Sequence, residues 1–173
     1  EVERILALLD RAARAGVETL VLTVDTSILG NRENNIRNGF STPLKPGLRL
    51  ALDGMVRPEW VIGTFLRTLL QHGMPYFENS YAERGAPLMS NSVMRDFGAR
   101  DHLNWAHAEL IRRHWKGKFV LKGIMTLADA QRAHQIGADG IILSNHGGRQ
   151  LDCAVSPLRI LPQVADALKG KVP

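Results

Sequence analysis

Cysteine is almost absent from this sequence of 173 residues, which contains only Cys153. A single cysteine excludes an intramolecular disulfide and is typical of a reducing compartment such as the cytoplasm. Aromatic residues make up only 6% of the chain, and no basic run is interleaved with them. The net charge of +5 therefore does not indicate a nucleic-acid partner. It does permit an anionic one, such as a phosphate, a carboxylate or an acidic membrane surface.

Hydrophobic residues are plentiful, at 45% of the chain, and helix and strand patterns alternate along it. The nearly continuous apolar runs of the strands are typical of a parallel sheet buried on both faces. The alternation predicts an α/β protein built from βαβ units, as in a barrel segment or a doubly wound sheet. Helices are predicted over 1–18, 102–115, 126–138 and 156–170, and strands over 17–25, 118–123 and 139–145.

A long insert, residues 41–100, separates the first strand from the next helix and far exceeds the usual connection of a few residues. Within it, 58–73 predicts a strongly amphipathic helix. This helix is too short and too charged to span a bilayer. It packs on its own domain or on a partner subunit, or it lies in a membrane interface. Its two apolar i, i+4 rows are Val61, Phe65, Leu69 and Ile62, Leu66, Leu70.

Chemically reactive side chains gather at the carboxyl ends of the predicted strands. In parallel α/β proteins the loops that leave these ends converge on one face of the sheet. A carboxylate, an imidazole, an ammonium and two guanidinium groups on one face indicate a site for an anionic ligand. The residues are Thr23, Asp25 and Arg32 after the first strand, Lys122 at the second, and Ser144, His146 and Arg149 after the third.

Two positions in this set stand out from ordinary polar residues at strand ends. Lys122 follows the run "FVL" and precedes Gly123. From this position at the end of a strand, we expect its long side chain to point into the mouth of a barrel. His146 is followed by Gly147 and Gly148, which let the backbone approach a ligand closely. A structural histidine would not require two such glycines.

The motifs "LTVDTSILGNRE", "VLKGI" and "SNHGGRQLD" together resemble those of the FMN-dependent L-2-hydroxy acid oxidases and dehydrogenases. The resemblance covers nearly the whole chain except the insert, and the third motif is the most specific. Its extension "SNHGGRQLDCAVSP" is most similar to the (S)-mandelate dehydrogenase branch. The resemblance implies a (β/α)8 TIM barrel, of which residues 1–173 hold about strands 4 to 6, with the insert after strand 4.

The same resemblance implies oxidation of an L-2-hydroxy acid to the 2-oxo acid, with a mandelate-like substrate favoured over lactate or glycolate. His146 is then the catalytic base, and Asp25 fixes its tautomer. Arg32 and Arg149 hold the substrate carboxylate through planar guanidinium groups. No metal ion is implied.

The implied cofactor is FMN, contacted by Thr23, Lys122 and Ser144, with Lys122 stabilising the negative charge of the reduced ring. The resemblance also implies a homo-oligomer, a tetramer. We expect a cytoplasmic enzyme with peripheral contact to the inner face of the cell membrane through 58–73, passing electrons to a quinone or similar acceptor. Because the chain stops where another element should begin, we expect a fragment that is inactive alone. The alternative from another class is a non-catalytic module that binds an anion or a membrane.

Overall fold

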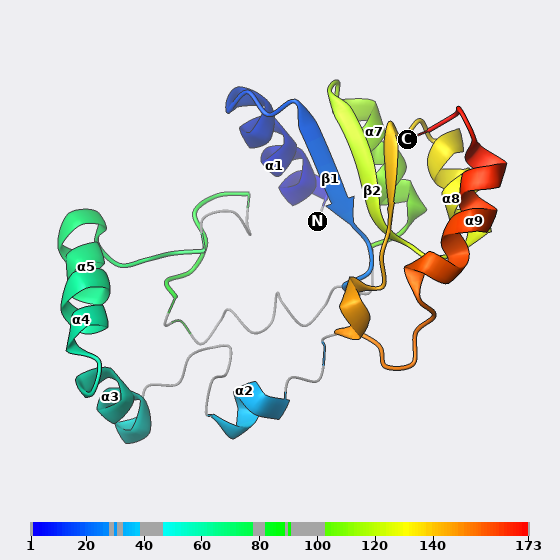
Figure 1. Ribbon diagram of the computed structural model, residues 1–173. Coiled ribbons are helices and arrows are strands. Elements are labelled where there is room, and N and C mark those ends of the chain that lie inside the picture. The colour runs from blue at the N-terminus through cyan, green and yellow to red at the C-terminus, as the bar shows by residue number, and fades with distance from the viewer. Residues whose placement is uncertain are drawn as a thin grey trace. The chain divides into compact units, whose positions relative to one another are not determined.

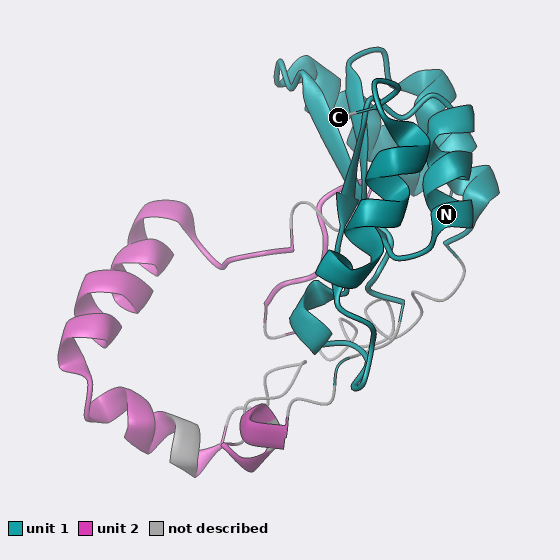
Figure 2. Ribbon diagram, turned by 45° about the vertical axis from the view of Figure 1, so that its right-hand side comes forward, with its two compact units in different colours: residues 1–31, 99–173 teal, residues 32–98 magenta. Residues whose placement is uncertain are grey.

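The computed structural model describes residues 2–27, 30, 33–38, 47–77, 82–88, 90 and 103–172. The chain divides into two compact units (Figure 2). Unit 1 comprises Glu1–Asn31 and Ala99–Pro173, and unit 2 comprises Arg32–Gly98.

Unit 1 is built around a three-stranded parallel sheet in the order β1, β2, β3 (Figure 1). Its strands are β1 (Thr19–Thr23), β2 (Lys118–Ile124) and β3 (Gly140–Leu143). In the middle of the sheet Leu121 pairs with Leu22 on one side and with Ile141 on the other. The predicted α/β class with parallel strands is therefore confirmed. β1 and β3 are shorter than predicted at both ends, whereas β2 extends one residue beyond the predicted 118–123.

The hydrophobic core lies between one face of this sheet and the helices α1, α7, α8 and α9, all of which contribute to it (Figure 1). Phe119 and Leu121 of β2 are fully buried at its centre. These helices are α1 (Val2–Arg14), α7 (Trp105–His114), α8 (Leu127–Gln135) and α9 (Pro157–Leu168). Their predicted positions are confirmed. Leu9, Ile111, Ala133 and Leu168 of these helices belong to the same core cluster as Phe119 and Leu121.

The second face of the sheet carries alternate residues of the strands and remains partly exposed. Val21 of β1 is 46% exposed and Ile142 of β3 is 41% exposed, although both are large and apolar. Their neighbours Leu20 and Ile141 point the other way and pack against the core. Lys122 lies on this second face, paired in register with Thr23 and Ile142.

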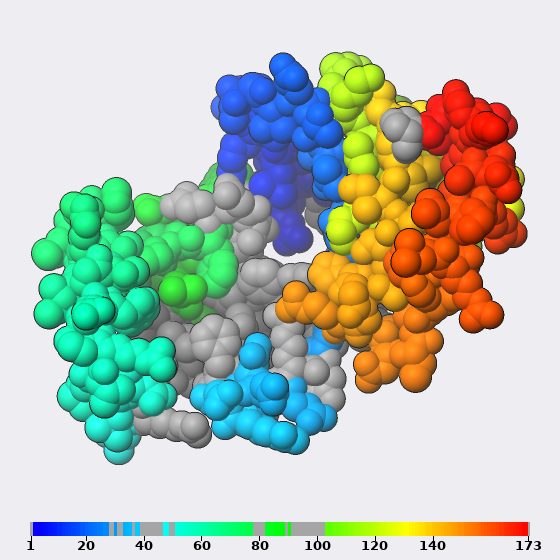
Figure 3. All heavy atoms as spheres, in the orientation of Figure 1, coloured from blue at the N-terminus to red at the C-terminus, as the bar shows by residue number. Residues whose placement is uncertain are grey.

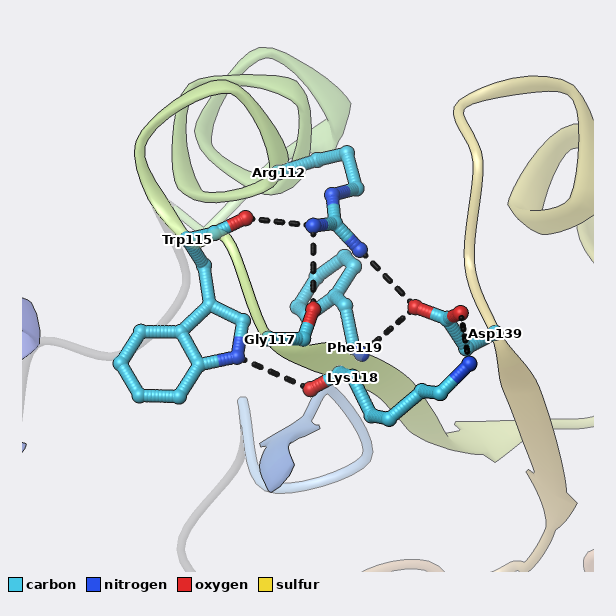
Figure 4. Close-up of polar contacts among 6 residues, drawn as sticks. All are labelled: Arg112, Trp115, Gly117, Lys118, Phe119 and Asp139. Atoms are coloured by element: carbon cyan, nitrogen blue, oxygen red, sulfur yellow. Dashed lines mark hydrogen bonds and ion pairs between the residues drawn. The ribbon is translucent and has the colours of Figure 1, made fainter. Parts of the chain in front are cut away.

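At the amino ends of β2 and β3, Asp139 ties helix α7 to the sheet (Figure 4). Its carboxylate accepts hydrogen bonds from Arg112 Nη1 at 2.9 Å, from Lys118 Nζ at 3.1 Å and from the backbone N–H of Phe119 at 2.9 Å. Arg112 also donates to the carbonyl oxygens of Trp115 and Gly117. This cluster fixes the start of β2, and with it the register that brings Lys122 to the opposite end of the strand.

Unit 2 contains the helix expected over 58–73, with a π-helical stretch in its middle. The segment runs through α4 (Pro58–Trp60), a π-helical stretch η1 (Val61–Leu66) and α5 (Arg67–His72), and it ends at Gly73 with φ 74°. Of its two apolar rows, the one that contains Ile62 and Leu70 is the more exposed, at 64% and 86% for these residues. No helix within the described ranges is long and apolar enough to cross a membrane. The other helices among the described residues of unit 2 are α2 (Glu33–Arg37) and α3 (Leu48–Met55).

Candidate active site

The carboxyl ends of the three strands meet at one edge of the sheet, where the short 3-10 turn η2 (His146–Gly148) follows β3 (Figure 1). The segment after β3, coloured orange, lies at the molecular surface (Figure 3). Parallel pairing aligns Thr23 with Lys122, and the chain after β1 continues into Asp25. The predicted convergence of strand-end residues on one edge is therefore seen in the structure.

Asp25 lies at the centre of this edge, and its side chain is only 9% exposed. Its Oδ1 is 3.1 Å from Nδ1 of His146, and its Oδ2 accepts a hydrogen bond from Ser144 Oγ at 3.0 Å. The Lys122 ammonium is 3.5 Å from the same Oδ2. Asp25 thus contacts three of the other residues singled out in the sequence.

Ser144 joins the same residues through a single hydroxyl group. Its Oγ accepts hydrogen bonds from Lys122 Nζ at 3.2 Å and from the backbone N–H of His146 at 3.0 Å. Its one proton is donated to Asp25, which as a carboxylate can only accept. The hydroxyl therefore has all its hydrogen-bonding capacity in use within the site.

Two opposing effects act on the pKa of Asp25. Burial is the largest single effect and raises the pKa. Hydrogen bonds from His146 and Ser144, with the charges of Lys122 and His146, lower it and together outweigh burial, so the pKa lies below the ordinary 3.8. Because Asp25 is ionised at neutral pH, the neutral ring of His146 carries its proton on Nδ1. Nε2 is then left with a lone pair that can accept a proton.

The turn that carries His146 has an unusual backbone. His146, Gly147 and Gly148 have φ angles of 58°, 67° and 70°, all in the left-handed region. A Cβ on either glycine would meet nothing within 4 Å. The backbone conformation itself therefore favours glycine at positions 147 and 148. His146 is a non-glycine residue held in the same strained conformation, as is common at functional sites. Asn145 supports the turn by accepting a hydrogen bond from the backbone N–H of Gly147 at 3.1 Å.

Arg149 directly follows this turn and is exposed. A Cβ on Gly30 would overlap the carbonyl oxygen of Arg149, so the backbone after β1 lies against the backbone after β3. Arg32 lies outside the described residues. Sequence reasoning did not single out Gly123 or Asn145 as part of the site. The sequence did offer one signal for Gly123, which is a glycine directly after Lys122 at the end of a strand.

The donor set of this edge suits proton transfer and anion binding. Within the described ranges, no three His, Cys, Asp or Glu side chains are grouped so that they could hold a metal ion. A carboxylate–histidine pair beside a lysine, at the carboxyl edge of a parallel sheet, makes this part of the α/β protein a candidate acid–base site. The chain belongs to the family of FMN-dependent dehydrogenases, whose sequence model matches residues 1–173.

Individual relatives agree with this assignment. The chain is 37% identical to (S)-mandelate dehydrogenase of Pseudomonas putida over 88% of its own length and 38% of the relative. It is 41% identical to L-lactate dehydrogenase of Ectopseudomonas mendocina over 95% of its own length and 42% of the relative. The chain thus spans about two fifths of the curated relatives it matches.

Solved structures resemble the chain as well. A crystal structure of the monotopic membrane protein (S)-mandelate dehydrogenase matches with a TM-score of 0.74 and 35% identity, covering 91% of this chain and 41% of that one. A mandelate oxidase variant with the C4a-OH-FMN adduct matches with a TM-score of 0.60 and 32% identity, covering 96% and 36%.

Proposed function

We propose that this chain is part of an FMN-dependent enzyme that oxidises an L-2-hydroxy acid to the 2-oxo acid. The observation that carries the proposal is the 3.1 Å contact between Asp25 Oδ1 and His146 Nδ1, which leaves Nε2 of His146 available as a base. Family membership adds that the relatives are FMN-dependent dehydrogenases.

In this proposal the sheet is strands 4 to 6 of a (β/α)8 barrel, with residues 41–100 as an insert after strand 4. In such a barrel the helices pack on the outer face of the sheet, and side chains of the strands fill the interior. The packing of the unit 1 helices on one sheet face, with Val21 and Ile142 exposed on the other, supports this arrangement. So does the TM-score of 0.74 to (S)-mandelate dehydrogenase.

The residues of the site fit FMN by their donor chemistry. Lys122 is a cation on the second face of the sheet, at its carboxyl edge, where Thr23 and Ser144 add hydroxyl groups. Lys122 would hold the edge of the flavin that becomes negative on reduction, and the two hydroxyls would lie beside the ring. When bound, FMN supplies the acceptor for two electrons.

The catalytic step requires a base and a fixed substrate. His146 Nε2 takes one proton, either from the α-carbon, which leaves a carbanion, or from the hydroxyl as the α-hydrogen leaves as a hydride. In both routes Asp25 stabilises the imidazolium that forms. Arg149 and Arg32 would hold the substrate carboxylate by charge-assisted hydrogen bonds.

A mandelate-like acid is the favoured substrate, because the solved (S)-mandelate dehydrogenase is similar to this chain in structure. L-Lactate is the second candidate on the 41% identity to an L-lactate dehydrogenase, and glycolate the third. We further propose a homotetramer in the cytoplasm that contacts the inner face of the cell membrane through 58–73 and passes electrons to a quinone. The monotopic membrane relative and the exposed Ile62 and Leu70 support the membrane contact.

The deciding experiment uses the full-length enzyme that contains this chain. Purified protein should be yellow, and (S)-mandelate added under nitrogen should bleach the flavin absorbance faster than L-lactate or glycolate does. Faster bleaching by L-lactate would reassign the substrate within the family. A colourless protein, or one whose flavin no L-2-hydroxy acid bleaches, would favour the alternative hypothesis, a non-catalytic module that only binds an anion or a membrane.

A further inference from the structure

Gly123 occupies a β-bulge between Lys122, which faces the candidate site, and Ile124, which packs in the core. The pairing of β2 with β3 is regular up to Lys122, which pairs with Ile142, and resumes with Ile124 opposite Leu143. The irregularity falls on Gly123, whose φ of 106° is open to glycine and strained for other residues.

The bulge changes which face of the sheet the following residue occupies. Phe119 and Leu121 point to the helices, so strict alternation would turn residue 123 to the core and Ile124 to the second face. Ile124 is instead 3% exposed and belongs to the core. The extra residue therefore lets Lys122 point to the site while Ile124, two positions later, packs in the core.

Asp25 fills the space that a side chain at position 123 would occupy. A Cβ built on Gly123 would lie 2.6 Å from Cβ of Asp25, 2.8 Å from its Cγ and 2.8 Å from its backbone nitrogen. Carbon atoms do not approach this closely, and two of these three atoms are backbone or Cβ atoms that a change of rotamer cannot move away. Any residue larger than glycine must shift Asp25.

Such a shift would act on the contacts that Asp25 makes. Its carboxylate is held at 3.1 Å from His146 Nδ1 and 3.0 Å from Ser144 Oγ, so a displacement of a few tenths of an ångström or more disturbs both hydrogen bonds. We propose that Gly123 is a positioning residue for the Asp25–His146 pair. This inference rests on the proposed function, in which that pair provides the base.

The test is Gly123→Ala in the full-length FMN enzyme, with Gly137→Ala as a matched control. Gly137 also has a left-handed φ, 84°, but a Cβ there would only touch side-chain carbons of Arg112 at 3.8 Å and 3.9 Å. We expect Gly123→Ala to bind FMN, to keep its KM within about twofold and to lose on the order of 10²-fold in kcat, the cost of misplacing a catalytic group. Gly137→Ala should keep kcat within about twofold.

A double-mutant cycle distinguishes action through Asp25 from a general loss of structure. In an Asp25→Asn background the pair is already impaired, so adding Gly123→Ala should lower kcat by much less than it does in the wild type. Equal fold-losses in both backgrounds, or a kcat in Gly123→Ala that matches that of Gly137→Ala, would overturn the inference. A wild-type enzyme that turns over no L-2-hydroxy acid would instead overturn the proposed function.

Folding provides a second readout that does not depend on turnover. If Gly123→Ala yields no folded holoenzyme, it is combined with Asp25→Gly, which removes the two side-chain atoms nearest the new Cβ. Recovery of a folded, FMN-bound double variant would support the contact with Asp25. Failure of the double variant, when Asp25→Gly alone folds, would show that the side chain of Asp25 is not what excludes a larger residue at position 123, and would overturn the inference.

Discussion

Asp25 and His146 are 121 residues apart in the sequence, and their side chains lie 3.1 Å apart at the carboxyl edge of the sheet. The contact joins the end of β1 to the turn after β3, although β2 lies between these strands. It therefore depends on the whole sheet having formed. The carboxylate accepts from Nδ1 and so orients the ring of His146.

Replacing His146 by Gln in the full-length enzyme tests its proposed role as the base. We expect FMN to stay bound and kcat to fall by roughly 10² to 10⁴-fold, the usual contribution of general-base catalysis. Steady-state kinetics with the absorbance spectrum of the flavin provides the measurement. His114→Gln, an exposed position on α7, is the control and should leave kcat unchanged. Near-normal turnover in His146→Gln would remove the residue from the mechanism.

Replacing Arg149 by Met tests the proposed carboxylate contact. A charge-assisted hydrogen bond contributes roughly 1.5 to 3 kcal/mol, so kcat/KM for the acid should fall by about ten- to a hundredfold. Most of the loss should appear in KM, with a smaller loss in kcat. Arg159→Met changes an exposed arginine on α9 and is the control. We expect the same pattern for Arg32→Met, and an unchanged KM in both variants would place the carboxylate elsewhere.

Much of the fold followed from local sequence patterns. The apolar runs around Leu22, Leu121 and Ile141 predicted buried parallel strands, and these three residues pair in register. Because all strands of a parallel sheet end at the same edge, the sequence also predicted that Asp25 and His146 lie at one site, although it gave no distance between them. These predictions depend on periodicity and chain direction, which are properties of the sequence itself.

Other features depend on contacts between distant segments and could not be predicted. The bulge at Gly123 arises where β2 pairs with β3 and meets the loop after β1. The role of Asp139 as acceptor for Arg112 and the Phe119 backbone required the packing of α7 on the sheet. The left-handed φ of Gly147, which favours glycine, was not predicted either. That Gly147 lets the backbone approach a ligand closely stays a prediction.

The exposed apolar row of the 58–72 segment provides a test of the membrane proposal. Replacing Ile62 and Leu70 together by Asn should move the enzyme from the membrane fraction to the soluble fraction, because each exposed side chain loses its apolar area for the interface. Bleaching of flavin by substrate should be retained. The control is Gln71→Asn, an exposed polar change on the same segment, which should leave the distribution unaltered. Wild-type protein found wholly in the soluble fraction at low salt would contradict the proposal.

Asp139 provides a stability prediction with a defined dependence on pH. The backbone N–H of Phe119 and the side chain of Lys118 hold its pKa below 3.8, with a further contribution from the charge of Arg112. Because the pKa is depressed in the folded state, the stabilisation is fully present above the unfolded pKa near 3.8. It is lost as the pH falls through the lower, folded-state pKa.

We therefore expect Asp139→Asn to lower the free energy of unfolding of the full-length protein by about 1–2 kcal/mol at neutral pH. The expected loss of stability is modest because the Asp139 carboxylate is 30% exposed, so that solvent screens its interactions. Urea unfolding of wild type and variant, repeated from about pH 7 to about pH 3, should show the difference shrinking only below about pH 4. Asp166→Asn, an exposed change on α9, should show no difference at any pH. A deficit of Asp139→Asn that stayed constant to the lowest pH would mean that the carboxylate charge is not what stabilises the junction of α7 with β2, since the charge is lost there by protonation.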